Sequence, residues 1–169
     1  MDCLNALRMA VREYSESARG WGYRIGGERA GTHESLVLES NVVASIFHRM
    51  LNAGVAEEMI RVDSKGRDLT VFDGGEILLA VQVKRITNAD RAYVYGGPGH
   101  EKNNFVSDIK RLAAESNGDR AFVVFDPLDR LRTRTLKNTN VTWEAFLKRL
   151  CHKKGVVFLM IRPNAQAHT

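Results

Sequence analysis

Hydrophobic positions recur along the chain with two spacings, one typical of helices and one typical of strands. Leu4, Leu7, Val11 and Tyr14 recur at helical spacing and predict a first helix over residues 3–17. Asp2, which precedes it, is expected to be the N-cap. A second helix is expected over 32–51 behind Thr32, and further helices over 104–116 and 142–153.

Five apolar segments between these helices are typical of strands. The first three, over residues 57–63, 68–72 and 76–86, are separated only by the turn sequences "SKG" and "DGG", which predicts an antiparallel meander. Strands over 120–126 and 155–163 then alternate with helices. The order predicts an α/β fold with a mixed central sheet flanked by helices, in a single domain over residues 1–169.

Two polar side chains interrupt the apolar strand "LLAVQVKRI". Gln82 and Lys84 are two residues apart, so they point to the same face of an extended chain. Asp68 opens the preceding strand fourteen residues earlier, and the "DGG" turn would bring it close to both. A carboxylate, an amide oxygen and an ammonium group would then meet, and oxygen ligands of this kind suit Mg²⁺. Two simpler interpretations remain open: Lys84 pairs only with Asp68, and Gln82 only satisfies a backbone group.

A further carboxylate falls on the apolar stripe of the second helix. Glu39 precedes Val43 by four residues and Ile46 by seven, so it is expected to face the core. A buried carboxylate needs a partner, which would be a metal ion or a cation such as Arg61 or Arg85.

These residues resemble a known signature. "RDLTVF", followed by "QVK" with Asp68 fourteen residues before Gln82, resembles the motif of the PD-(D/E)xK nucleases, the restriction-endonuclease-like superfamily. The order of helix, three-strand meander, helix and strand over about residues 32–126 is similar to the core of that family, and "QxK" resembles the subset related to Mrr-type restriction enzymes. The resemblance implies a restriction-endonuclease-like three-layer core and phosphodiester cleavage that depends on Mg²⁺ or Mn²⁺.

The resemblance also implies roles for single residues. Asp68 would be the central metal ligand, Gln82 would occupy the second ligand position, and Lys84 would be the catalytic lysine. Glu39 matches an acid that many members carry on the preceding helix, and so a third metal ligand. Two departures stand out: Arg67 precedes Asp68 where proline is common, and the neutral Gln82 leaves one negative charge fewer, which should weaken metal binding.

The charge of the chain is uneven. The net charge is +5, and residues 127–154 hold eight basic side chains against two acidic ones, which is the electrostatic footprint of a polyanion binder. Arg130, Arg132 and Arg134 would form one ridge if the segment is extended. The loop over residues 88–104 could fold over a duplex. The predicted nucleic-acid contacts are therefore Arg85, Lys102, Arg130, Arg132, Arg134 and Lys137.

Other features of the sequence exclude some classes of function. The five histidines show no metal-ligand spacing, and no glycine-rich phosphate loop follows a strand. Two distant cysteines and the lack of a signal-like N-terminus favour a reducing cytoplasm, and no apolar run approaches the roughly 20 residues that cross a bilayer, so no membrane partner is expected.

The sequence therefore predicts a metal-dependent endonuclease from a phage, mobile-element, restriction or defence context. DNA is favoured over RNA as the substrate, and homodimer formation stays open because symmetry leaves no mark in one sequence. The alternative is a non-catalytic member of the same fold that acts as an immunity protein, an antitoxin or a nucleic-acid-binding module. The neutral Gln82 favours this alternative.

Overall fold

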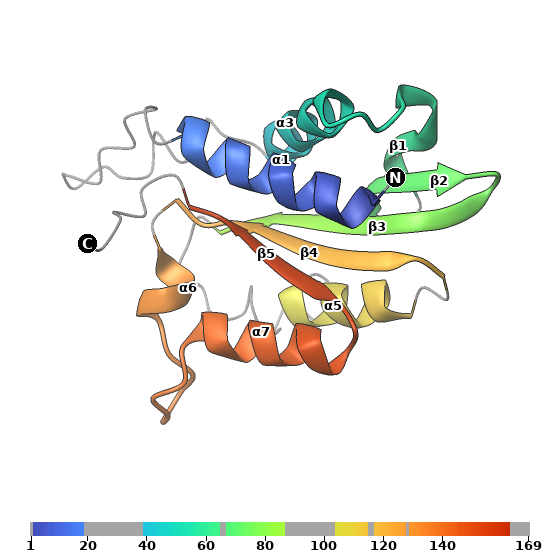
Figure 1. The fold of residues 1–169 in the computed structure, drawn as a ribbon. Coiled ribbons are helices and arrows are strands. Elements are labelled where there is room, and N and C mark those ends of the chain that lie inside the picture. Colours follow the sequence, from blue (N-terminus) through green and yellow to red (C-terminus); the bar gives the residue numbers. More distant parts are fainter. Residues whose placement is uncertain are drawn as a thin grey trace.

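A five-stranded mixed β-sheet forms the centre of the fold, and helices cover both of its faces (Figure 1). The computed structural model describes residues 2–18, 39–64, 67–86, 104–114, 117–127 and 129–162. Helices α1 (Cys3–Ala18) and α3 (Glu39–Asn52) lie on one face, and α5 (Phe105–Ala113) and α7 (Trp143–Lys153) lie on the other. The predicted α/β class, with helices on either side of a mixed sheet, is confirmed.

The strands follow one another across the sheet in chain order. β1 (Ile60–Ser64), β2 (Arg67–Asp73) and β3 (Glu76–Arg85) form the predicted antiparallel meander, and β4 (Asp119–Phe125) and β5 (Val157–Ile161) continue the sheet in parallel. The first strand begins later than predicted, because a short 3₁₀-helix, η1 (Glu57–Met59), occupies the start of the segment.

The turn between β2 and β3 and a register shift within the hairpin together set the strand pairing at the site. Asp73 pairs with Glu76 across two glycines, Gly74 with φ +54° and Gly75 with φ +90°. Positive φ at both central positions matches the right-handed twist of a hairpin, and glycine adopts it without steric cost. Between Val71 and Phe72 the pairing shifts by one residue, as in a β-bulge. Leu69 therefore pairs with Val81, and the start of β2 lies beside the second half of β3.

The central strands are buried on both faces, and each face has its own core. On β3, Leu79, Val81 and Val83 pack toward α1 and α3, whereas Ala80 and Ile86 pack toward α5 and α7. Gln82 and Lys84 have the same parity as Ala80 and Ile86, as the alternation of side chains along a strand requires. Gln82 and Lys84 therefore follow an apolar run, Ile77–Val81, on a strand whose other charged residues, Glu76 and Arg85, lie at its two ends.

Three described helices begin at side-chain caps. Asp2 accepts the backbone N–H of Asn5 at 2.9 Å, which confirms the predicted N-cap of α1. Thr142 caps α7 through Ala145, and Asn104 caps α5 in a reciprocal capping box. Thr32 and the first part of the predicted helix over 32–51 lie outside the described residues. None of the described helices is both long and apolar enough to cross a membrane.

The basic segment after β4 is not extended. Residues Arg130–Thr133 form a short helix, α6, because the buried carboxylate of Asp126 accepts the backbone N–H groups of Arg130 and Leu131, each at 2.9 Å. The ridge predicted from Arg130, Arg132 and Arg134 is therefore wrong. Residues two apart on a helix point in different directions, so Arg130 and Arg132 do not share one side, and Arg134 follows the helix as its C-cap.

Candidate functional site

The site lies where β3 continues past the start of β2. Beyond the Leu69–Val81 pair, the backbone N–H of Val83 donates to Asp68 Oδ2 at 2.6 Å. The side-chain nitrogen of Gln82 donates to the same oxygen. The Oδ1 atom of Asp68 makes no hydrogen bond within the described part of the chain, and the residue lines a cavity. Oδ2 of Asp68 thus links β2 to β3 through hydrogen bonds, and Oδ1 remains available to a ligand.

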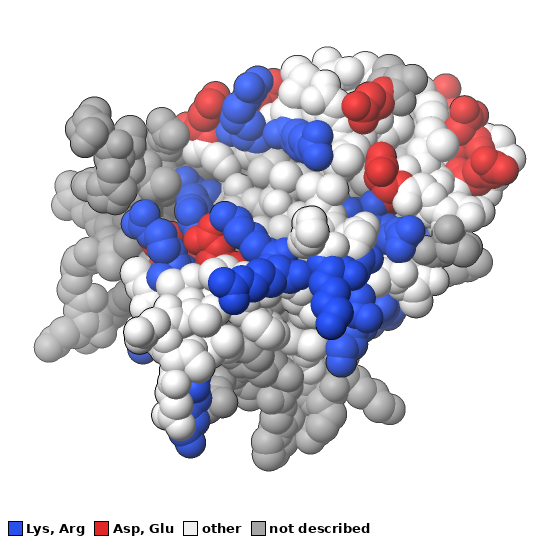
Figure 2. Space-filling model, turned by 60° about the horizontal axis from the view of Figure 1, so that its bottom comes forward, with Lys and Arg blue, Asp and Glu red and all other residues white. Residues whose placement is uncertain are grey.

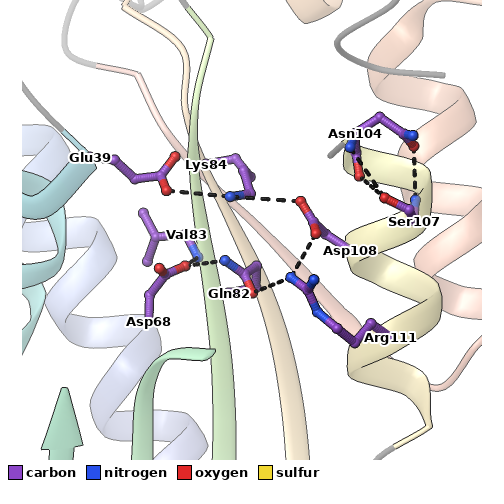
Figure 3. Close-up of polar contacts among 9 residues, drawn as sticks. All are labelled: Glu39, Asp68, Gln82, Val83, Lys84, Asn104, Ser107, Asp108 and Arg111. Carbon is purple, nitrogen blue, oxygen red and sulfur yellow. Dashed lines mark hydrogen bonds and ion pairs between the residues drawn. The ribbon is translucent and has the colours of Figure 1, made fainter. Parts of the chain in front are cut away.

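Lys84 connects the two helical layers at this point (Figure 3). Its Nζ lies 3.3 Å from Glu39 Oε1 on α3 and 3.6 Å from Asp108 Oδ2 on α5. The side chain is only 18% exposed. Burial alone would lower the pKa of Lys84, but the nearby carboxylates outweigh it and hold the pKa above its ordinary value. Lys84 therefore stays charged at neutral pH.

The predicted partners of Lys84 and Glu39 need revision. The ion pair of Lys84 is formed with Glu39 and Asp108, whereas Asp68 bonds instead to Val83 and Gln82. Glu39 pairs with Lys84 rather than with Arg61 or Arg85, and its side chain is 34% exposed rather than in the core. It lies at the start of the described part of α3, beside the cavity.

Two residues of α5 belong to the site, although neither was predicted. Asp108 is buried, and its Oδ1 accepts a 2.7 Å bond from Arg111. Arg111 also donates to the side-chain oxygen of Gln82 at 3.3 Å. Asp108 falls on the apolar stripe of α5 with Phe105, Ile109 and Leu112, the same signal that singled out Glu39. Arg111 gave no such signal, because an exposed arginine on a helix is ordinary.

Two carboxyl groups of the site, those of Asp68 and Asp108, have raised pKa values. Burial raises the pKa of Asp68 to about 6, although the Val83 N–H and the Lys84 ammonium act in the opposite direction. Burial likewise raises the pKa of Asp108, despite its two cationic neighbours. A bound cation beside Asp68 would favour the ionised form.

A cavity of about 360 Å³ borders the site. Asp68 and Glu39 line it together with a wall that is mostly apolar, formed by Ser40, Val43, Ala44, Phe47 and Val62. Two carboxylates on a cavity that is large enough for a small ligand can bind a cation and, through it, an anionic group.

The donor set suits Mg²⁺ in part. Mg²⁺ needs only one or two carboxylates because it keeps several waters, and Asp68 and Glu39 supply two. Gln82 fits less well, since its nitrogen faces Asp68 and its oxygen faces Arg111. Within the described ranges, no three histidine, cysteine, aspartate or glutamate side chains are grouped to hold one metal ion.

The predicted nucleic-acid contacts are scattered. Arg85 ends β3 next to Lys84, and Lys102 lies outside the described residues, as does the loop that was expected to cover a duplex. Arg132 pairs with Asp129 at 2.5 Å, and Arg134 and Lys137 are exposed beyond α6. Figure 2 shows that Lys and Arg side chains gather on the face that carries α6 and α7. The exposed lysine and arginine residues of α7 and its C-cap are Lys148, Arg149, Lys153 and Lys154.

Comparisons of the chain with protein-family models, with curated proteins and with solved structures found no match in any of the three. A functional proposal therefore depends on the residues of the site.

Proposed function

We propose that the chain is a nuclease with a restriction-endonuclease-like core, which hydrolyses phosphodiester bonds in DNA with the help of Mg²⁺ or Mn²⁺. The observation that carries the proposal is the convergence of Asp68, Gln82 and Lys84 with Glu39 beside one cavity. These residues come from two strands and a helix, and an ion pair with a purely structural role would not need Glu39 to share a cavity with Asp68.

Each residue would have a separate task. Asp68 and Glu39 would hold the cation, which when bound supplies Lewis-acid stabilisation of charge on the scissile phosphate. Lys84 would place its ammonium group beside the same phosphate and stabilise the negative charge that develops in the transition state. Because its pKa is held above the ordinary value, Lys84 is charged for this task at neutral pH.

The test is cleavage of supercoiled plasmid and, separately, of RNA in the presence of Mg²⁺ or Mn²⁺. We expect Asp68→Ala and Lys84→Ala each to lower the rate at least about 100-fold, as is usual when a group that stabilises a transition state is removed. Asp119→Ala, which removes an exposed carboxylate at the start of β4, is the matched control and should cleave like the unmodified chain. Full cleavage by both site variants would refute the site, and no cleavage by the unmodified chain would refute the function.

One observation favours a second function, a binding module without catalysis. The polar groups satisfy one another without a metal ion, since Gln82 donates to Asp68 and Lys84 is paired on both sides. Calorimetric titration with Mg²⁺ and Mn²⁺ separates the two functions. A nuclease should bind the ion through Asp68 and lose the binding heat in Asp68→Ala, whereas a binding module need show no such heat.

A further inference from the structure

The side-chain amide of Gln82 lies between two groups of opposite hydrogen-bonding character (Figure 3). Its nitrogen donates to Asp68 Oδ2, and its oxygen accepts a bond from Arg111 Nη2 at 3.3 Å. Gln82 is buried, and both of its contacts are part-buried. The residue that the sequence suggests as a metal ligand therefore has its only ligating atom engaged by Arg111.

Arg111 is itself held in place. Its Nη2 atom bonds to Asp108 Oδ1 at 2.7 Å, and Asp108 is fixed in turn by Lys84. The start of α5 is set by the capping box, in which Ser107 N–H donates to Asn104 Oδ1 at 2.9 Å. The side chain of Asp108 is 5% exposed and that of Arg111 is 51% exposed, so a buried anchor holds an accessible guanidinium group.

This arrangement permits one orientation of the amide. A guanidinium group only donates hydrogen bonds, and an ionised carboxylate only accepts them. Turning the amide would place its N–H groups against Arg111 and its oxygen against Asp68. Both hydrogen bonds would then be broken, and each would be replaced by an approach of like partial charges.

We propose that Arg111 is a positioning residue that holds the Gln82 amide with its nitrogen toward Asp68. In this role Gln82 is a hydrogen-bond donor that orients the carboxylate, and not a ligand of the cation. The hydrogen-bonding role stands independently of any reaction, whereas its effect on cleavage rests on the proposed function. Second-layer partners of this kind typically change metal affinity or activity by about 10–100-fold when removed.

The orientation can be observed without metal or substrate. The chain contains two glutamines, Gln82 and Gln166, so ¹⁵N-glutamine labelling gives two side-chain amide groups, and Gln166→Glu identifies the signals of Gln82. We expect the Gln82 amide protons to exchange slowly with solvent, one of them being shifted by its bond to Asp68. Arg111→Met should speed this exchange and move the signals. Lys110→Met, which removes a neighbouring charge on α5, should leave them unchanged.

The conservative substitution Arg111→Lys tests whether the positioning of the Gln82 amide can be rescued. Both bonds of Arg111 start from the same nitrogen, so one ammonium group can replace it. We expect Arg111→Lys to restore the slow exchange of the Gln82 amide. Unchanged Gln82 signals in folded Arg111→Met would overturn the proposal.

Kinetics test the effect on cleavage. We expect Arg111→Met to lower kcat about 10-fold with KM within about two-fold, because the substitution disturbs Asp68 and not substrate binding. In a Gln82→Met background, the same substitution should change kcat by less than about two-fold, since its route of action is already gone. An undiminished effect in that background would show that Arg111 acts through Asp108 and Lys84 or on the phosphate itself. A change in KM alone would assign Arg111 to direct phosphate binding, and either result would overturn the positioning role.

The amide measurements and the cleavage kinetics together distinguish failure of the nuclease function from failure of the positioning role. If the unmodified chain cleaves no nucleic acid but the Gln82 signals depend on Arg111, the nuclease function fails and the positioning role stands. If cleavage depends on Asp68 and Lys84 but the Gln82 amide signals do not change in Arg111→Met, the nuclease function stands and the positioning role fails.

Discussion

Asp68 occupies the second position of β2, where its carboxylate accepts the backbone N–H of Val83 beyond the first residue pair of the β2–β3 ladder. The side chain thus has a structural role that does not depend on catalysis. Both of its bonds end on Oδ2, so an asparagine with its oxygen in that place could retain them. The ionised charge of Asp68 can therefore be tested apart from its hydrogen bonds.

We expect Asp68→Asn to stabilise the chain at pH 7.5 in the absence of divalent ions. The folded-state pKa of about 6 lies above the ordinary value, so the folded chain binds this proton more tightly than the unfolded chain. Stability is then reduced as pH rises from about 4 through about 6, and the variant avoids that reduction. Urea unfolding should show a gain on the order of 1 kcal/mol at pH 7.5 and little change at pH 4. Destabilisation at both values would contradict the raised pKa.

The sequence identified part of the site at this scale. Gln82, Lys84 and Glu39 were recognisable because each interrupts an apolar pattern, and Asp108 could have been recognised in the same way. Their pairing was not recognisable, because it depends on which helix packs beside the end of β3. Arg111 enters the site only through the placement of α5.

At the scale of elements, the position of β3 depends on glycines with positive φ, and at one of them the backbones approach closely. Gly74 and Gly75 form its turn with β2, and Gly118 leads into β4 with φ +76°. A Cβ atom at Gly118 would lie 2.2 Å from the backbone oxygen of Ile77, a distance that no side chain tolerates. The parallel pairing of β4 with β3, which continues beyond the β2–β3 ladder, therefore requires glycine at position 118.

We expect Gly118→Ala to destabilise the chain by about 2–4 kcal/mol, since it combines strain at positive φ with a backbone clash. Gly155→Ala is the matched control. Gly155 also has positive φ, at +65°, but its Cβ would meet nothing within 4 Å, so the chain should be destabilised by only about 1 kcal/mol. Equal destabilisation of the two variants in denaturant unfolding would show that the clash with Ile77 has no energetic effect.

The short helix α6 shows the limit of pattern reasoning for elements. The spacing of Arg130, Arg132 and Arg134 is compatible with a strand, but the buried Asp126 at the end of β4 accepts two N–H groups and starts a helical turn. Only the burial of Asp126 determines that outcome, and local spacing does not reveal it.

For the whole molecule, the sheet separates two cores, and each contains one cysteine. Cys3 belongs to the core beside α1 and α3, and Cys151 belongs to the core beside α7. Neither forms a disulfide and both are buried, and burial raises the pKa of Cys151 to about 12. The two thiols lie on opposite faces of the sheet and therefore cannot form a disulfide with each other in the folded chain.

We expect both thiols to resist modification while the chain is folded. With an aromatic disulfide reagent at pH 8, labelling should be at least about 100-fold slower than in denaturant, because the reactive thiolate is both disfavoured and covered. Cys151→Ser leaves one thiol and assigns the rates. Rapid labelling of Cys151 in native buffer would contradict its place in the core.

The basic face over α6 and α7 is expected to contribute affinity for nucleic acid rather than catalysis. Replacing Arg149, Lys153 and Lys154 with glutamine should weaken duplex binding and flatten its dependence on salt by about 0.9 for each phosphate that is no longer neutralised. The cleavage rate at saturating substrate should stay the same as in the unmodified chain. Arg8→Gln with Arg12→Gln, on α1, is the control. An unchanged salt slope in the α7 variant would show that this face does not bind the nucleic acid.

The sequence by itself determined the class of fold, the antiparallel meander and the polar residues of β3, because periodicity, turn residues and buried polarity are local properties of the chain. The tertiary structure alone decided that Lys84 bridges α3 and α5, that Arg111 engages the oxygen of Gln82, and that the basic segment forms a helix. These outcomes depend on where separate elements pack, and the energy of a buried polar group is determined by neighbours that are distant in the chain.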